Sequence, residues 1–128
     1  MINWLLQNIY TFLGKKSKKL SFGKIYFERI IIKNQTPKNS DLKDQEFIEV
    51  NYKGKSYWVI FKCPCGCGEV ITLPLIDTHD PFWEISRTIH NRPTIYPSVW
   101  QNKGCYSHFW IEDGKIEWCR NTGNKPLY

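Results

Sequence analysis

The sequence lacks an apolar run long enough to cross a bilayer, and it lacks the arrangement of a secretory signal. Its first apolar stretch, MINWLLQNIYTFLG, precedes its positive charges, which is the reverse order of a signal peptide. Repeats and low-complexity tracts are also absent. These absences predict a cytoplasmic protein without a transmembrane segment. In that reducing setting, clustered cysteines indicate metal ligands rather than disulfides.

The chain has 128 residues, of which 41% are hydrophobic and 16% are aromatic. This length suits one domain with a real but modest core, because small domains bury a low fraction of their surface. A structural metal would help to stabilise such a domain. The aromatic content argues against disorder of the whole chain.

The net charge of +6 is unevenly distributed. Residues 1–62 carry 12 basic and 5 acidic side chains, whereas residues 63–128 carry 6 and 7. A basic first half could contact nucleic acid, an anionic surface or an acidic protein partner, or could simply keep the protein soluble. Nucleic acid is the less favoured partner, because the basic residues are spread over separate predicted strands and loops.

The pattern of apolar residues predicts a mainly β fold, a small antiparallel β domain, with α+β as the alternative. Residues 2–13 have helical spacing and precede the basic run KKSKK, so residues 1–20 form a separate amphipathic segment that packs on the domain or binds a membrane surface or partner. Residues 21–128 form a single zinc-binding β domain. Its expected strands cover 24–33, 46–52, 56–62, 69–75, 83–89 and 94–100, followed by a hairpin over 107–119.

Three cysteines alternate in the stretch FKCPCGCGEV, which joins two predicted strands. Cys63, Cys65 and Cys67 can present their sulfurs on one side of a loop that the intervening glycines allow to curl. Cys105 and His108 form a C-x2-H pair that can complete a tetrahedral site. We therefore expect bound Zn²⁺, with copper(I) or an iron–sulfur cluster as alternatives. Five candidate ligands compete for four places.

A two-residue turn at Asp113-Gly114 would set the register of the last hairpin. In that register Phe109, Ile111, Ile116 and Trp118 share the core face. His108 would then face Cys119, which we interpret as a reserve ligand or a semi-buried thiol, and Glu117 would lie one diagonal step away.

Four residues are candidates for chemistry near the metal. Glu69 and Glu117 could activate a water bound to zinc, or could be ordinary solvent-facing strand residues. Ser107 is a candidate nucleophile, although adjacent residues on a strand point to opposite faces and so pair poorly with each other. Ser98, in YPSVW, is a second candidate nucleophile, and it could instead support the site as a reserve ligand or be a hydroxyl hydrogen-bonded beside a proline-bent edge strand. His79 and His90 fall in predicted loops and are expected at the surface.

Several motifs occur together and in order between residues 57 and 120: CPCGCG, a downstream Trp, TIYPSV, CYSHF and GKIEW. This combination resembles a small bacterial family of domains of unknown function. Members of that family occur in operons with ubiquitin-like conjugation machinery, and they are thought to be zinc-dependent peptidases. The resemblance aligns Cys63, Cys65, Cys67, Cys105 and His108 with the family's metal-type motif and Ser98 and Ser107 with its serines.

The resemblance implies a zinc peptidase or isopeptidase that trims a ubiquitin-like precursor or releases it from a target. Its partners would be a ubiquitin-like protein or its conjugates. Two alternatives stay open at this stage: a non-catalytic zinc-stabilised interaction module and a nucleic-acid-binding zinc domain. An open coordination position on the metal would favour the peptidase, whereas four protein ligands would favour a structural site.

Overall fold

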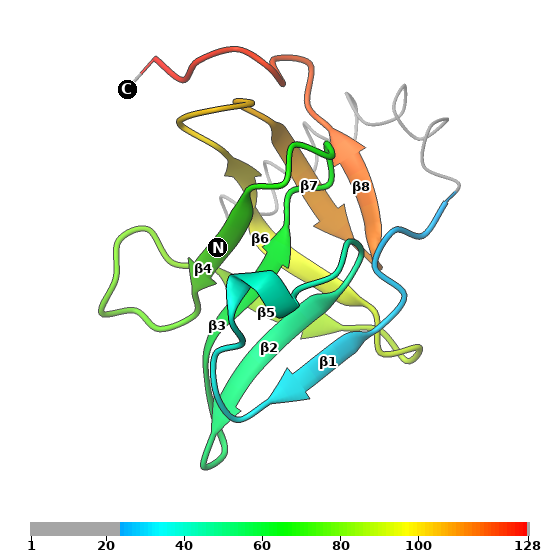
Figure 1. Cartoon of the computed structure of the whole chain (residues 1–128), viewed down its shortest axis with the longest axis vertical. Helices are drawn as coiled ribbons and strands as arrows, with labels where there is room; N and C mark the ends of the chain where they lie inside the picture. The colour runs from blue at the N-terminus through cyan, green and yellow to red at the C-terminus, as the bar shows by residue number, and fades with distance from the viewer. Residues whose placement is uncertain (1–23, 128) are drawn as a thin grey trace.

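A computed structural model describes residues 24–127 of the chain, and these residues form two four-stranded sheets (Figure 1). The helix expected over residues 2–13 and the boundary at residue 20 lie outside the described residues. The first sheet has the order β1-β2-β3-β4, with bounds Ile30–Lys33, Phe47–Tyr52, Lys55–Lys62 and Val70–Pro74. The second has the order β5-β6-β7-β8, with bounds Glu84–Arg87, Pro93–Trp100, His108–Glu112 and Lys115–Trp118. The prediction of a mainly β fold is therefore confirmed.

All neighbouring strands are antiparallel except β1 and β2, which are parallel. The connection between these two strands contains a short 3-10 helix, η2 (Asn39–Asp41). The strand expected over residues 24–33 is confirmed only in its last four residues. Residues 26 and 27 instead donate their backbone N–H groups to the Gly114 carbonyl in the turn of the last hairpin, at 2.8 and 2.9 Å.

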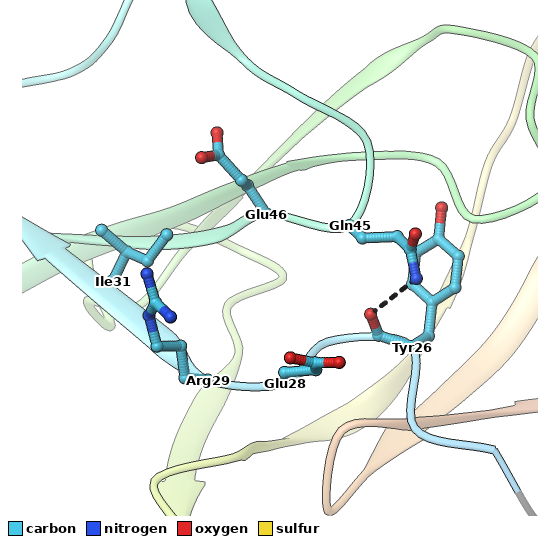
Figure 2. A pocket seen from close by; sticks show the side chains of 6 residues that line it. All are labelled: Tyr26, Glu28, Arg29, Ile31, Gln45 and Glu46. Carbon is cyan, nitrogen blue, oxygen red and sulfur yellow. Dashed lines mark hydrogen bonds between the residues drawn. The ribbon is translucent and has the colours of Figure 1, made fainter.

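The segments that lead into β1 and β2 enclose a hollow of about 290 Å³. Its lining mixes opposite charges, and the Gln45 amide spans it by donating to the Tyr26 carbonyl at 3.2 Å (Figure 2). Glu28, Arg29 and Glu46 line the rest together with Ile31. None of the cysteines, serines or histidines singled out from the sequence belongs to this lining.

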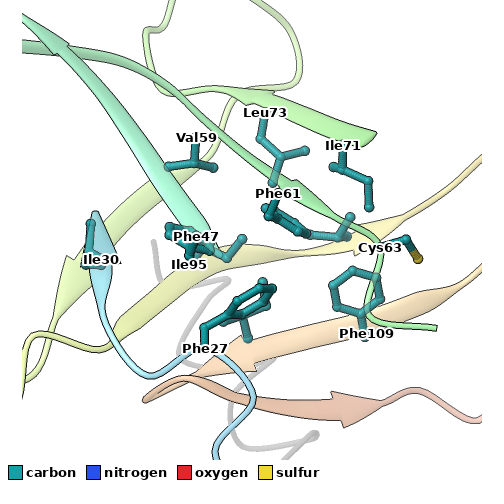
Figure 3. Packing of buried hydrophobic residues seen from close by; sticks show 12 residues of the cluster. Phe27, Ile30, Phe47, Val59, Phe61, Cys63, Ile71, Leu73, Ile95 and Phe109 are labelled. Carbon is teal, nitrogen blue, oxygen red and sulfur yellow. The ribbon is translucent and has the colours of Figure 1, made fainter. Parts of the chain in front are cut away.

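The core lies between the two sheets, because its buried members come from both (Figure 3). Phenylalanines dominate it: the Phe47 and Phe61 rings stack at 5.4 Å, and Phe109 of the second sheet meets Phe61 edge-on at 6.4 Å. Phe27 fills the space between them and is fully buried. Cys63 extends this core to the end of β3, so the cysteine stretch begins on a fixed, buried residue.

The hairpin register predicted from the Asp113-Gly114 turn is confirmed in all four residue pairs between β7 and β8. Phe109 and Ile111 are buried, and Ile116 and Trp118 pack partly buried against the same core. Both turn residues have positive φ, at 52° and 75°, as a tight two-residue hairpin turn requires. Among the described residues, no helix is long and apolar enough to span a membrane.

Candidate active site and metal centre

The cysteine stretch forms a tight turn that closes the gap between β3 and β4. The Cys63 N–H donates to the Glu69 carbonyl at 2.9 Å, and the Gly66 N–H donates back to the Cys63 carbonyl at 3.1 Å. Gly66 and Gly68 have φ of 92° and 88°, a conformation that side chains disfavour. The turn curls as the glycine spacing predicted, and it faces the loop between β6 and β7.

Four thiols meet at this point. The sulfurs of Cys63, Cys65, Cys67 and Cys105 all lie within 4.8 Å of one another. Cys63 Sγ is 3.5 Å from Cys65 Sγ and 3.8 Å from Cys105 Sγ. Sulfurs bound tetrahedrally to zinc at about 2.3 Å lie about 3.8 Å apart. The donor set and its spacing therefore fit a four-coordinate metal ion such as zinc.

Hydrogen bonds favour deprotonated sulfur, the form that binds metal, at one member of the cluster, Cys65. Burial alone would raise the pKa of the Cys65 thiol, but hydrogen bonds from Ser107, Cys67 and Cys63 outweigh it and lower that pKa to about 7. Burial instead dominates at Cys63 and raises its pKa well above the usual range. The Glu69 N–H adds a contact to Cys67 Sγ at 3.5 Å. A bound cation would relieve the repulsion between neighbouring thiolates.

The structure thus groups four of the five predicted ligands and leaves His108 outside the group. Cys119 is also outside it. Cys119 lies beside His108 as the hairpin register predicted, and its N–H donates to the His108 carbonyl at 2.9 Å. Ser107 is buried against the thiols, whereas the neighbouring His108 side chain points elsewhere.

His108 lies between a serine and an asparagine. Its Nε2 is 3.0 Å from the Ser98 hydroxyl, and its Nδ1 is 2.6 Å from Asn121 Oδ1. Ser98 and His108 are half-buried and Asn121 is exposed, so solvent reaches this group of side chains. The linear order of hydroxyl, imidazole and fixed acceptor is that of a nucleophile, a general base and an orienting residue.

The asparagine fixes the protonation pattern of the ring. Because Asn121 Oδ1 can only accept, Nδ1 carries the proton and donates it. In a neutral imidazole Nε2 is then an acceptor, and the Ser98 hydroxyl donates to it. This tautomer allows the histidine to take the proton of the serine.

An irregularity in β6 brings Ser98 to His108. The β6–β7 register shifts between the Ile95–Ile111 pair and the Val99–Phe109 pair, so β6 has two extra residues in this interval. Ser98 lies within it, directly after Pro97, which has no N–H to donate to a strand ladder. Trp100 then pairs with His108, which leaves Ser98 beside the histidine ring.

The segment after β8 supplies the third residue. It turns back over the start of β7, where the His108 N–H donates to the Thr122 hydroxyl at 2.9 Å. The Thr122 N–H in turn donates to the Cys119 carbonyl at 3.0 Å. These bonds hold Asn121 against the ring of His108. Sequence reasoning missed Asn121, because the only sign of it was the turn-rich composition of RNTGN.

Two tryptophans frame the serine and histidine. The Trp100 indole stacks on the His108 ring at 4.1 Å with an interplanar angle of 1°. The Trp83 indole N–H donates to the Ser98 carbonyl at 3.3 Å. The first contact restricts rotation of the imidazole, and the second fixes the backbone of the irregular strand.

The other predicted site residues lie apart from this arrangement. Glu69 is exposed at the end of the cysteine turn, and Glu117 is buried opposite Trp110 on β8. His79 and His90 are exposed, as expected, with contacts to Thr78 and Arg92 respectively. The residue at hydrogen-bond distance from His108 Nδ1 is Asn121 rather than a carboxylate.

Comparison with known families agrees with a serine as the central residue. Residues 32–119, more than half of the chain, match the model of the BubE family, which is described as the bacterial ubiquitination-like system serine protease. The matched range contains Ser98, His108 and the four clustered cysteines but ends before Asn121. No curated protein and no solved structure gave a significant match. The chain belongs to the BubE family of serine proteases of bacterial ubiquitination-like systems.

Proposed function

We propose that this protein is a serine peptidase that cleaves peptide or isopeptide bonds at the C-terminal tail of a ubiquitin-like protein. The observation that carries the proposal is the hydrogen-bonded series Ser98–His108–Asn121. The substrate class rests on the family to which the chain belongs. The free thiols suit a reducing compartment, so we propose a cytoplasmic enzyme.

The chemistry follows from the protonation pattern of the ring. The Ser98 hydroxyl oxygen attacks the scissile carbonyl while its proton passes to His108 Nε2. The protonated Nε2 then gives that proton to the leaving amine, and an acyl ester remains on Ser98. A water molecule, deprotonated by the same nitrogen, then attacks the ester carbonyl, and Nε2 returns that proton to the Ser98 oxygen as the ester bond breaks and the carboxylate product leaves. Asn121 keeps Nδ1 protonated throughout and so holds the ring in its productive orientation.

We propose that zinc has a structural role in this enzyme. Four thiolates close a tetrahedral site and leave no position for a catalytic water. Zinc would be held by Cys63, Cys65, Cys67 and Cys105 and would supply only a cross-link between two loops. Those loops are the β3–β4 turn and the β6–β7 connection, which carries His108 at its end. From the sequence, a zinc-bound water activated by Glu69 or Glu117 was the expected attacking group, and here Ser98 takes that role.

The proposal predicts that Ser98→Ala abolishes cleavage. The assay uses a fusion of the ubiquitin-like protein encoded in the same operon, with a reporter joined after its tail. Removing a serine nucleophile lowers kcat by roughly 10⁴-fold or more. Ser86→Ala is the matched control, because Ser86 is an exposed serine on β5 of the same sheet. Undiminished cleavage by Ser98→Ala would refute the serine mechanism, and equal loss in both variants would show that the effect is not specific to Ser98.

A further inference from the structure

The strand β4 (Val70–Pro74) has one edge that no described strand covers. It is the last strand of its sheet and pairs only with β3 in the described part of the chain. An open strand edge exposes backbone donors and acceptors that can pair with another extended chain. Exposed strand edges in proteins are usually covered, twisted away from neighbouring molecules, or paired with another chain. The same three possibilities exist for β4.

The hydrogen bonds at either end of β4 identify the groups that point outward. The Leu75 N–H donates to Tyr57 of the β3 side, and the Glu69 carbonyl accepts from Cys63, so odd-numbered residues face β3. The Pro74 carbonyl accepts from Trp83 on the opposite side, so even-numbered residues face away. The N–H and C=O groups of Val70 and Thr72 therefore point to the open edge.

A hollow of about 270 Å³ runs along this edge. One wall is β4 with the residue before it, from Glu69 to Leu73. The other wall is the end of β6 and the following loop, from Val99 to Lys103, and Trp83 completes the lining. Backbone groups without strand partners and a hollow beside them are the two requirements for binding an extended peptide by strand addition.

Two side chains that line the hollow also contact residues of the proposed active site. Trp83 bonds to β4 through its N–H to the Pro74 carbonyl at 2.8 Å and bonds to Ser98 through its indole at 3.3 Å. Trp100 lines the hollow and stacks on His108. A peptide that lies along β4 would therefore contact the same two tryptophans that contact Ser98 and His108.

We propose that the open edge of β4 binds the extended tail of the substrate as an additional strand, with backbone bonds to Val70 and Thr72. This inference rests on the proposed peptidase function and defines what the site accepts. It selects an unfolded, strand-forming segment beside the cleaved bond, such as the flexible tail of a ubiquitin-like protein. Helices, and folded surfaces without an open strand edge, are excluded, because they have no free row of backbone groups to pair with β4.

The first test is Thr72→Pro, compared with Thr72→Val. Proline removes the outward N–H and leaves the β3 pairing intact, a position where edge strands tolerate it. Valine keeps the N–H and changes only an exposed side chain. For the reporter fusion we expect KM to rise about tenfold or more in Thr72→Pro, with little change in Thr72→Val. Equal KM values in two variants with the same melting temperature would overturn the proposal.

The second test does not require a proline variant to fold. Amide exchange is measured by NMR on Ser98→Ala, with and without a ten-residue peptide that has the tail sequence of the operon's ubiquitin-like protein. The Val70 and Thr72 amides should exchange quickly alone and slow at least tenfold with peptide. The Ile71 and Leu73 amides, which pair with β3, should be slow in both states and serve as internal controls.

Three results would overturn the inference in this second test. They are no peptide binding at millimolar concentration, binding that leaves Val70 and Thr72 unprotected, and protection that appears without peptide as the protein concentration rises. The last result would identify a second copy of the chain as the occupant. None of these three results would contradict the serine mechanism. That mechanism is tested separately, by whether Ser98→Ala still cleaves the fusion.

Discussion

The role of His108 depends on the direction of its side chain, which the spacing C-x2-H does not determine. Between Cys105 and His108 the backbone passes through Tyr106, whose φ is 53°. This turn places the Cys105 thiol and the Ser107 side chain beside the cysteines of the β3–β4 turn, whereas the His108 ring contacts Ser98. Sequence reasoning could find the two groups of residues, but it joined them into one site, because a two-residue spacing suits a shared metal as well as a division between two sites.

At the same scale, substitutions of Asn121 test whether this residue orients the His108 ring. Asn121→Ala should lower kcat by about 10²-fold or more, because the ring loses the acceptor that fixes its tautomer. Asn121→Asp keeps an acceptor and should retain much of the activity. Its carboxylate favours the protonated ring, so the acidic limb of the pH–rate profile should move to higher pH.

The measurement is kcat/KM against pH for the three proteins with the reporter fusion. Asn121→Asp is the matched control, since it preserves size and the accepting oxygen. A variant Asn121→Ala with the rate and pH profile of the parent would contradict the orienting role.

At the scale of elements, the last hairpin was predictable and the irregular strand before it was not. The Asp113-Gly114 dipeptide fixes a two-residue turn, and the turn fixes every pair in β7 and β8. Ser98 lies among the extra residues of β6. The number of these residues is set by the pairing of β6 with β7, which the sequence does not reveal. The proline in YPSVW indicated a bend but not its length, so Ser98 was predicted only as a second candidate after Ser107, without its pairing to His108.

Two hairpin turns with nearly the same backbone provide a prediction at this scale. Lys53-Gly54 and Asp113-Gly114 have φ values of 51° and 81°, and 52° and 75°. A Cβ at Gly54 would meet nothing within 4 Å, whereas one at Gly114 would lie 2.3 Å from the Phe27 carbonyl oxygen. Gly54→Ala should therefore destabilise by about 1 kcal/mol, from backbone conformation alone. Gly114→Ala should lose roughly 3 kcal/mol or more, because the segment that places Phe27 must move.

Denaturant unfolding followed by tryptophan fluorescence gives both free energies of unfolding. Gly54→Ala is the control for the cost of placing a side chain at positive φ, since both glycines have nearly the same backbone conformation. Equal losses in the two variants would mean that residues 26 and 27 do not pack against the hairpin turn as described.

At the scale of the whole molecule, composition and strand patterns predicted a mainly β domain but not its division into two sheets. Which strands pair depends on contacts between distant residues, such as the parallel pairing of β1 with β2 across a polar loop. The ion pair between Glu49 of β2 and Arg87 of β5, at 2.6 Å, also links the sheets without a local sequence signal. The cysteine cluster was predictable, because three of its thiols are local and the fourth is the cysteine of a second motif.

The proposed zinc site gives a prediction for the stability of the whole molecule. We expect about one zinc per chain, because four thiolates bind one tetrahedral ion. Cys105→Ser should lose the metal and lower the melting temperature by about 10 °C or more, since metal binding and folding are coupled. Cys119→Ser should retain the metal, because Cys119 lies outside the cluster.

Elemental analysis gives the metal content of the two variants, and thermal unfolding with and without a chelator gives their melting temperatures. Full metal content in Cys105→Ser, or loss of the metal in Cys119→Ser, would contradict the assignment of the four ligands.

The central claim is that Ser98 is the nucleophile, and covalent labelling tests it most directly. The folded, metal-loaded protein is treated with a fluorophosphonate, which reacts with activated serines, and the labelled peptide is identified by mass spectrometry. We predict one label per chain, on Ser98, and none in Ser98→Ala. Active protein that carries no label on Ser98, or carries it on Ser107 instead, would contradict the account.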